Sequence, residues 1–144
     1  MGSNKFGAKK VRADGYVFDS TLEYEYYLYL KSTVPVVSMY SKIIVIVHPK
    51  YEFIHNGILL CTYTADFEIV NPDGSKIVVD VKAVNFSRPK QRKNGSLYQP
   101  KPKIVTKTSS FATNMNMMRA FYGIEVKIIY RHAGKWAVLN DWQK

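Results

Sequence analysis

The sequence predicts one domain of the mixed α/β (α+β) class, with a central mixed β-sheet flanked by helices. Three observations support this fold class. The chain has 144 residues, a length typical of a single domain with its own hydrophobic core. Hydrophobic residues make up 47% of it and charged residues 22%, as in an ordinary globular protein. A helical stretch is followed by several strand-like stretches, a second helical stretch and further strands, an order typical of helices packed on one sheet.

The N-terminal residues predict an arm ahead of this domain. Residues 1–17 carry several cations and end in the turn sequence ADGY. They contain no apolar segment of the kind found in signal peptides, and no apolar run in the chain approaches the roughly 20 residues that cross a membrane. The one cysteine, Cys61, excludes an internal disulfide and a multi-cysteine zinc site. We therefore expect a cytoplasmic protein whose single domain spans residues 18–144.

A first helix is expected from about Ser20 to Ser32. Ser20 and Glu23 have the spacing of a capping box at a helix N-terminus. Glu25 lies about 200° from Glu23 around the helix axis, so it is expected to face solvent. Apolar residues recur at helical spacing and predict a buried face. They are Leu22, Tyr26 and Tyr29 or Leu30.

Two stretches after this helix have the composition of strands. Residues 43–57, IIVIVHPKYEFIHNG, are rich in β-branched and aromatic residues and are expected to break at Pro49. Residues 58–83, ILLCTYTADFEIVNPDGSKIVVDVKA, predict a hairpin of two strands joined by the turn NPDG.

The rest of the chain predicts a loop, a helix and two strands. Residues 85–103 contain three prolines and show no apolar periodicity, so we expect a long basic loop, either functional or disordered. Residues 109–123, SSFATNMNMMRAFYG, predict a helix that a serine caps and Gly123 ends. Residues 124–132 and 135–144 predict the last strands.

The charge of the chain points to a polyanionic partner. There are 21 lysines and arginines against 11 acidic residues, a formal net charge of +10. No acidic residue occurs from Val81 to Ile124. No basic amphipathic helix suggests a membrane surface, so nucleic acid is the expected partner. The basic residues expected to bind it are Lys5, Lys9, Lys10, Arg12, Arg88, Lys90, Arg92, Lys93, Lys101, Lys103 and Lys107.

Acidic residues and a lysine occur where the predicted hairpin is otherwise apolar. Asp66 lies in its first strand, and Asp80 and Lys82 share one face of its second strand. A charged pair within an apolar run is costly unless it is partnered or binds something. Asp66 and Asp80 are suited to share one Mg²⁺ or Mn²⁺ ion, because hard oxygen ligands favour these metals. Glu23 or Glu25 would supply a further carboxylate.

The alternative is a structural role for the same residues. In that case Asp80 and Lys82 form an ion pair on the strand surface and Asp66 caps a turn, because a D-x-K motif alone matches by chance. The histidines show no metal-ligand spacing and are expected to be surface or loop residues. They are His48, His55 and His132.

The joint pattern of Glu23, Asp66 and D-x-K resembles the PD-(D/E)xK nuclease superfamily, whose members have the restriction-endonuclease-like fold. The stretches KFGAKKVRADGYVFDSTLEYEYYLYLK, ADF and VVDVKA are similar to small phage-encoded endonucleases that resolve four-way DNA junctions. The resemblance covers about residues 5–84. Two positions depart from the family pattern. Ala65 stands where many members have proline, and Asp80 is shorter than the usual glutamate.

The resemblance implies roles for the matching residues. Glu23, Asp66 and Asp80 would be catalytic carboxylates and metal ligands, the backbone carbonyl of Val81 a further ligand, and Lys82 the motif lysine. The implied activity is Mg²⁺- or Mn²⁺-dependent hydrolysis of DNA by a homodimeric endonuclease, in the host cytoplasm if a phage encodes it, with branched or four-way junction DNA as the substrate. A noncatalytic DNA-binding module with the same fold and a nuclease subunit of a recombination or transposition system are the alternatives.

Overall fold

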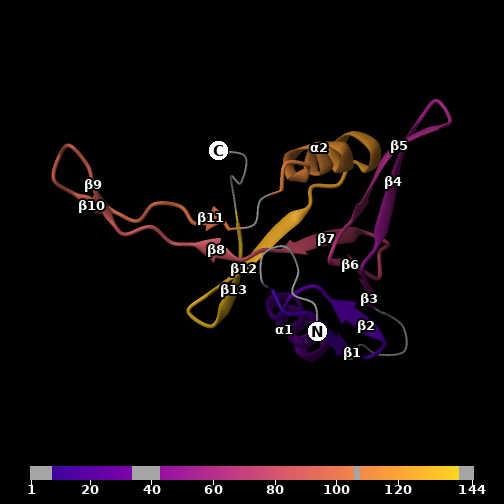
Figure 1. Cartoon of the computed structure of the whole chain (residues 1–144), viewed down its shortest axis with the longest axis horizontal. Coiled ribbons are helices and arrows are strands. Elements are labelled where there is room, and N and C mark those ends of the chain that lie inside the picture. Colours follow the sequence, from indigo (N-terminus) through magenta and orange to yellow (C-terminus); the bar gives the residue numbers. More distant parts are fainter. Residues whose placement is uncertain (1–7, 34–42, 106–107, 140–144) are drawn as a thin grey trace.

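The computed structural model describes residues 8–33, 43–105 and 108–139. It confirms the mixed α+β class, with a five-stranded mixed sheet and two helices among the described residues. The helices are α1 (Thr21–Thr33) and α2 (Phe111–Tyr122). They lie on opposite sides of the sheet (Figure 1). No helix within the described residues is long and apolar enough to cross a membrane.

The sheet has the strand order β13-β12-β7-β6-β3. Strands β7 and β12 are parallel, and the other three neighbouring pairs are antiparallel. A parallel pair needs a long crossover connection, and here that crossover contains the basic segment and α2. In this order, the strands are β13 (Lys135–Val138), β12 (Lys127–His132), β7 (Lys76–Val81), β6 (Phe67–Val70) and β3 (Ile44–Val47).

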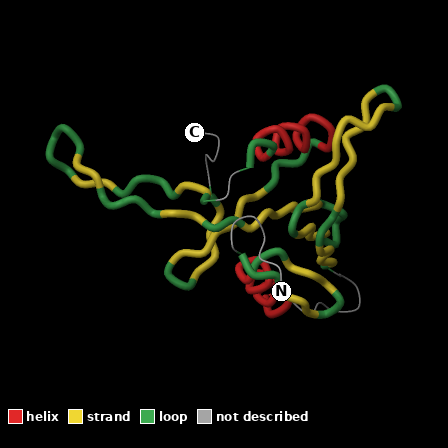
Figure 2. The backbone as a smooth tube through the Cα atoms, in the orientation of Figure 1, coloured by secondary structure: helices red, strands yellow, loops and turns green. Residues whose placement is uncertain are grey.

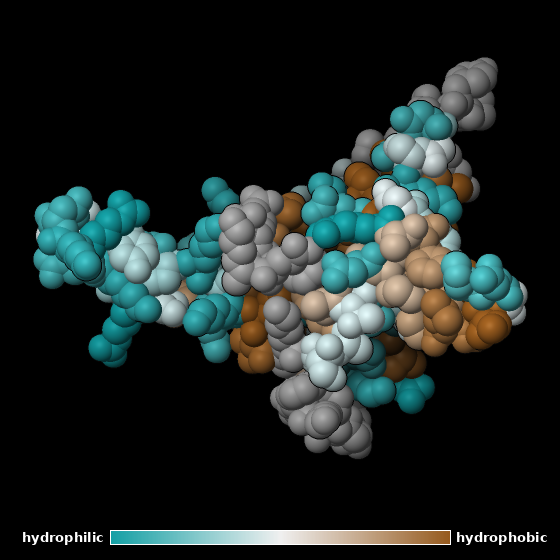
Figure 3. All heavy atoms as spheres, turned by 90° about the horizontal axis from the view of Figure 1, so that it is seen from above, coloured by the Kyte–Doolittle hydropathy of each residue, from teal (hydrophilic) through white to brown (hydrophobic). Residues whose placement is uncertain are grey.

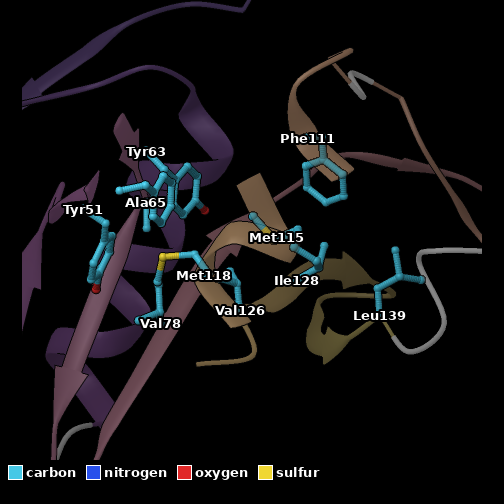
Figure 4. Close-up of a cluster of buried hydrophobic side chains, with 11 residues drawn as sticks. Tyr51, Tyr63, Ala65, Val78, Phe111, Met115, Met118, Val126, Ile128 and Leu139 are labelled. Atoms are coloured by element: carbon cyan, nitrogen blue, oxygen red, sulfur yellow. The ribbon is translucent and has the colours of Figure 1, made fainter. Parts of the chain in front are cut away.

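Each face of the sheet is covered by its own hydrophobic cluster. Successive residues of a strand point to opposite faces, so Val78 of β7 packs in the α2 cluster and Val79 in the α1 cluster. In the α2 cluster, Met115 and Met118 of α2 are almost fully buried (Figure 4). Because β7 is covered on both faces, its Asp80 and the Lys82 that follows the strand lie next to packed protein. The α1 cluster consists of Phe18, Tyr26, Tyr27, Leu30, Phe67, Val79, Val81 and Ile129.

The segment expected to be an arm ending in a turn contains a β-hairpin, β1 (Val11–Ala13) and β2 (Tyr16–Phe18). Its turn residues Asp14 and Gly15 both have positive φ, 51° and 81°, as a tight two-residue hairpin turn requires. The Tyr27 hydroxyl of α1 donates to Asp14 Oδ2 at 2.8 Å. The ADGY turn prediction is therefore right, but part of the arm is strand that packs on the first helix.

The long hairpin expected over residues 58–83 is divided into two. Strand β5 (Ile58–Thr64) pairs with β4 (Lys50–His55) in a separate hairpin, while β6 pairs with β7 across the predicted NPDG turn. The chain bends at Ala65–Asp66, opposite the bend at His48–Pro49: Ala65 N–H donates to the Pro49 carbonyl at 3.0 Å, and His48 N–H to the Asp66 carbonyl at 2.9 Å. These two bends carry the β4–β5 hairpin away from the sheet (Figure 1).

The basic segment over residues 85–103 is mostly loop and turn, as expected, but short paired strands join its two limbs into one projection (Figures 1 and 2). Its inner pair is β8 (Val84–Asn85) with β11 (Lys103–Ile104), and its outer pair is β9 (Lys90–Gln91) with β10 (Leu97–Tyr98). The three prolines lie between the two pairs, where proline has no ladder hydrogen bond to donate. We call residues 84–104 the basic arm.

The two helix predictions are confirmed within one or two residues. Helix α1 buries Leu30 rather than Tyr29, which is 40% exposed. Helix α2 ends at Gly123, whose positive φ of 64° and N–H bond to the Arg119 carbonyl close the last turn. Ser110 occupies the N-cap position of α2, although its side chain makes no capping hydrogen bond.

Candidate active site

Glu23 is positioned by the first turn of α1. Its N–H donates to Ser20 Oγ at 3.1 Å, as a capping box requires, while its own Oε2 accepts from the Asp19 N–H at 3.1 Å. The side chain is buried, with 2% of its surface exposed. The helix start therefore fixes this carboxylate on the face of α1 that packs against the protein.

Loss of the Ser20 cap is expected to destabilise this helix start. Ser20→Ala removes the hydroxyl that accepts from Glu23 N–H, and such caps contribute about 1 kcal/mol to stability. Urea unfolding should show a free energy of unfolding lower by about that amount. Ser32→Ala is the matched control, because Ser32 is exposed and its hydroxyl only donates to the Tyr29 carbonyl at the other end of α1. Equal stability of the two variants would contradict a capping role for Ser20.

Glu23 has a partner that the sequence did not suggest. His48 Nε2 lies 2.5 Å from Glu23 Oε1, and His48 occupies the bend between β3 and β4 with a φ of 55°. Burial raises the pKa of Glu23 above its usual value, while the hydrogen bond and charge of His48 oppose that rise. His48 is in a loop, as expected, but it is half-buried and joins the helix carboxylate to the bend at Asp66.

Asp66 occupies the second bend, immediately before β6. Its Oδ2 accepts a hydrogen bond from the Val81 N–H at 2.6 Å. Part of the residue remains exposed, yet the protein surrounds the carboxylate closely enough that burial raises its pKa well above the usual range. The negative charges of Asp80 and Glu23 raise this pKa further. The charges of the other two carboxylates therefore favour the protonated form of Asp66.

Asp80 and Lys82 lie side by side on the α2 face of β7. Asp80 is buried and accepts from the Tyr63 hydroxyl at 2.9 Å through Oδ2, while its Oδ1 lies 3.0 Å from Lys82 Nζ. The Lys82 ammonium also lies 5.6 Å from the centre of the Phe111 ring of α2. The i and i+2 spacing in β7 thus brings the two charges together, as predicted.

The environment of Lys82 ties the four predicted catalytic residues together. Burial lowers the pKa of this ammonium, but the charges of Asp80, Asp66 and Glu23 outweigh that effect and raise it. Three carboxylates and one cation therefore form a single electrostatic group. Glu25 is not part of it: its carboxylate pairs with Arg131 Nη1 at 2.5 Å and is 40% exposed.

The donor chemistry of this group fits a hard divalent cation. Asp66 and Asp80 offer carboxylate oxygens from two neighbouring strand ends, and their like charges disfavour each other without a cation between them. Within residues 8–33, 43–105 and 108–139, no three His, Cys, Asp or Glu side chains form a ready-made ligand set. A cation held here would have two aspartates as its main protein ligands, with Val81 adjacent through its N–H bond to Asp66.

The predicted DNA-binding residues lie in two places. Lys9, Lys10 and Arg12 are exposed at the N-terminal hairpin, where Lys10 Nζ lies 3.4 Å from Asp19 Oδ1. The structure exposes a second group along the basic arm. It consists of Arg88, Lys90, Arg92, Lys93, Lys101 and Lys103. Lys5 and Lys107 lie outside the described residues.

Sequence reasoning missed His48 and Tyr63. Both act on a predicted carboxylate from a strand or bend far away in the chain, so no local spacing links them. The usable signals were weak: His48 precedes the proline that breaks the strand, and Tyr63 lies three residues before Asp66.

Comparison with known proteins identifies a family. The family model described as "Protein of unknown function (DUF1064)" matches residues 3–107, which is more than half of the chain, so the protein belongs to this family. The matched region includes Glu23, Asp66, Asp80 and Lys82 as well as the basic arm. No curated protein and no solved structure matches the chain significantly.

Proposed function

We propose that this member of the DUF1064 family is a metal-dependent DNA endonuclease with a restriction-endonuclease-like core. The observation that carries the proposal is the single electrostatic group of Glu23, Asp66, Asp80 and Lys82 at the end of β7. A carboxylate whose pKa is raised by burial and by two neighbouring carboxylates, beside a largely buried cation, is typical of a functional site. A structural ion pair between Asp80 and Lys82 needs neither Asp66 nor Glu23.

Each residue has a role in this proposal. Asp66 and Asp80 would hold Mg²⁺ or Mn²⁺, and the ion would supply positive charge beside the phosphate that is hydrolysed. Lys82 stays a charged ammonium because its carboxylate neighbours raise its pKa, so it orients the attacking water and balances charge on the phosphate, while the water gives its proton to solvent. The Tyr63 hydroxyl holds Asp80 Oδ2, leaving Oδ1 beside Lys82. His48 holds Glu23 at the site. Water attacks phosphorus, and the 3′-oxygen leaves.

Branched or four-way junction DNA is the substrate we propose. The described residues present two separate groups of exposed cations, one on the N-terminal hairpin and one on the basic arm, and phosphate contacts of this kind position a protein without reading sequence. A noncatalytic DNA-binding module would keep these cations but has no use for three carboxylates facing phosphate. A nuclease subunit of a recombination or transposition system would keep both the exposed cations and the carboxylates.

One experiment separates these possibilities. Labelled four-way junction, fork, duplex and single-stranded DNA are incubated with the protein, with and without Mg²⁺. We expect Mg²⁺-dependent cleavage, fastest on the junction. Binding without cleavage of any substrate would favour the noncatalytic module, and equal cleavage of all four would remove the preference for branched DNA.

The proposed metal ligands give a direct prediction. Calorimetric titration with Mn²⁺ should show binding to the wild type that is lost or sharply weakened in Asp66→Asn and Asp80→Asn, because each change replaces a charged ligand with a neutral amide. Asp73→Asn is the matched control, since Asp73 lies in the exposed NPDG turn and bonds only Ser75. Wild-type affinity in both ligand variants would contradict the metal assignment.

We also propose that the enzyme works as a homodimer. One chain offers one catalytic group, and two symmetric cuts in a junction need two groups at a fixed separation. The tip of the β4–β5 hairpin supplies apolar surface for this contact: Ile58 is 66% exposed, Leu59 53% and Leu60 52%. Figure 3 shows hydrophobic atoms at the end of the molecule opposite the hydrophilic basic arm.

Light scattering tests the dimer. At micromolar concentration we expect a protein mass near twice that of one chain, both for the protein alone and for its complex with a four-way junction once the mass of the DNA is subtracted. Ile58→Ser with Leu60→Ser should shift the mass toward one chain, while the matched pair Val17→Ser and Val138→Ser, exposed elsewhere, should not. A single-chain mass both with and without the junction would leave a nicking enzyme.

A further inference from the structure

The basic arm begins at the catalytic group and is anchored there. Its first residue, Val84, follows Lys82 by two positions, and the Val105 N–H donates to the Ala83 carbonyl at 2.9 Å. The Phe86 ring packs against the ring of His132, in the neighbouring β12, with 4.4 Å between their centres. The inner end of the arm is thus fixed to the sheet, and its direction from the site is set by the fold.

The outer end of the arm is ordered by its own hydrogen bonds. The Arg92 N–H donates to the Ser96 carbonyl at 2.8 Å, and the Gly95 N–H to the Arg92 carbonyl at 2.9 Å. The Arg92 guanidinium lies 5.1 Å from the centre of the Tyr98 ring, and Tyr98 is paired with Lys90 across the ribbon. Cations and an aromatic ring therefore share one face of a defined two-stranded tip.

Nothing in the described part of the chain neutralises this tip. Arg88, Lys90, Arg92 and Lys93 are exposed, and none pairs with a carboxylate within residues 8–33, 43–105 and 108–139. Leu97 on the opposite face is 72% exposed, more than any other large hydrophobic residue described. An isolated two-stranded ribbon is marginally stable in water, so an arm with this composition gains most from a bound polyanion.

We infer that the basic arm lies in a groove of duplex DNA and holds the double-stranded segment that leads away from the scissile phosphate. The inference rests on the proposed endonuclease function and adds the form of DNA that the protein requires beside its site. The major groove of B-DNA is about 12 Å wide and admits a two-stranded β-ribbon. The cations contact phosphates, and Leu97 contacts the base edges.

The length of the arm sets the length of DNA that it contacts. From Val84 to Asn94 an extended strand advances at most about 33 Å, at about 3.3 Å per residue. One turn of B-DNA is about 34 Å long. A duplex segment shorter than about one turn therefore ends before the arm tip, and a longer one spans the whole arm.

The test measures binding against the length of the duplex segment, in EDTA so that no cleavage occurs. Fluorescence anisotropy is recorded for the full chain on labelled four-way junctions whose arms range from about 6 to about 20 base pairs around the predicted one-turn threshold. We expect the wild-type protein to bind more tightly as the DNA arms of the junction lengthen, with no further gain in affinity once each DNA arm exceeds about one helical turn.

A shortened arm provides the matched variant. Replacing residues 89–99 with Asn-Gly joins Arg88 to Pro100 in the register of the inner strand pair and removes Lys90, Arg92 and Lys93. The affinity of this variant should no longer depend on the length of the DNA arms, and its binding to junctions with long DNA arms should be at least about tenfold weaker. The slope of log binding constant against log salt concentration should be smaller by about 0.9 per lost phosphate contact. Duplex RNA should show no such difference, because its major groove is too deep and narrow to admit the ribbon.

Point variants keep the arm intact and separate charge from shape. Lys90→Gln with Lys93→Gln should lower the salt slope, whereas Lys127→Gln with Lys135→Gln, exposed cations of β12 and β13, should not. Leu97→Ser should weaken binding to junctions with long DNA arms while the dependence of affinity on salt concentration stays unchanged. The inference is overturned if the protein with the shortened basic arm still binds more tightly as the DNA arms of the junction lengthen, as the wild type does. Intact length dependence with no cleavage in Mg²⁺ would instead overturn the nuclease function alone.

Discussion

Replacing Lys82 with alanine is expected to reduce DNA cleavage by about 10³-fold while DNA binding stays close to that of the wild type. Lys82 Nζ lies 3.0 Å from Asp80 Oδ1 and is 22% exposed, so the ammonium reaches the place where a phosphate would meet the carboxylates. The predicted phosphate contacts of binding lie elsewhere, on the basic arm and the N-terminal hairpin. Single-turnover cleavage and anisotropy on one junction measure the two quantities separately.

The Lys82→Ala variant also removes the ammonium beside Asp80, so its folding must be checked. Asp80 and Asp66 would then lack the positive charge of Lys82, and a lower free energy of unfolding is expected. Lys82→Arg is the control, because it keeps the charge but replaces a compact ammonium with a planar fork. We expect Lys82→Arg to recover stability without recovering cleavage. Full activity of Lys82→Ala in a folded protein would exclude Lys82 from the chemistry.

The parts of the fold that the sequence predicted are those with local causes. The first helix follows from the Ser20 and Glu23 spacing and from apolar residues on one face. The β6–β7 hairpin follows from NPDG between two apolar runs. The pairing of Asp80 with Lys82 needs only the alternation of a strand. Each of these signals lies within a few residues of the structure that it specifies.

The features that the sequence did not predict depend on contacts between distant segments. Residues 58–70 read as one strand, but the hydrogen bonds between the bends at His48 and Asp66 divide them between two sheets. The basic arm contains prolines and lacks the alternation of apolar residues that marks a strand. Its short strands are therefore defined by their pairing with each other and not by their composition. The contact of Glu23 with His48 crosses from a helix to a strand bend, and nothing in the spacing of the two residues indicates it.

Asp66 gives the second large effect, in which activity and stability change in opposite directions. In the metal-free protein, burial and the charges of Asp80 and Glu23 raise the pKa of Asp66 above its unfolded value. The folded state therefore binds this proton more tightly than the unfolded chain, and stability falls as the pH rises from about the ordinary value of 3.8 through the raised value. The metal-free wild type is thus expected to be less stable at neutral pH than at mildly acidic pH.

Asp66→Asn removes the charge but keeps an oxygen that can accept from the Val81 N–H. At neutral pH without metal, we expect this variant to be more stable than the wild type, because the raised pKa of Asp66 means that its ionised form destabilises the folded state. Its cleavage activity should be lost. Mn²⁺ should raise the melting temperature of the wild type and not that of the variant, because only the wild type binds the ion.

Asp80→Asn is the control with the opposite expected sign. Asp80 is held by Tyr63 and by Lys82, so neutralising it leaves the largely buried Lys82 ammonium without its closest partner and should destabilise the fold. Both variants are expected to be inactive, and urea unfolding at neutral pH in EDTA should place them on opposite sides of the wild type. A destabilised Asp66→Asn would show that the Asp66 carboxylate serves the fold, and the site would then have to be explained as a structural ion network.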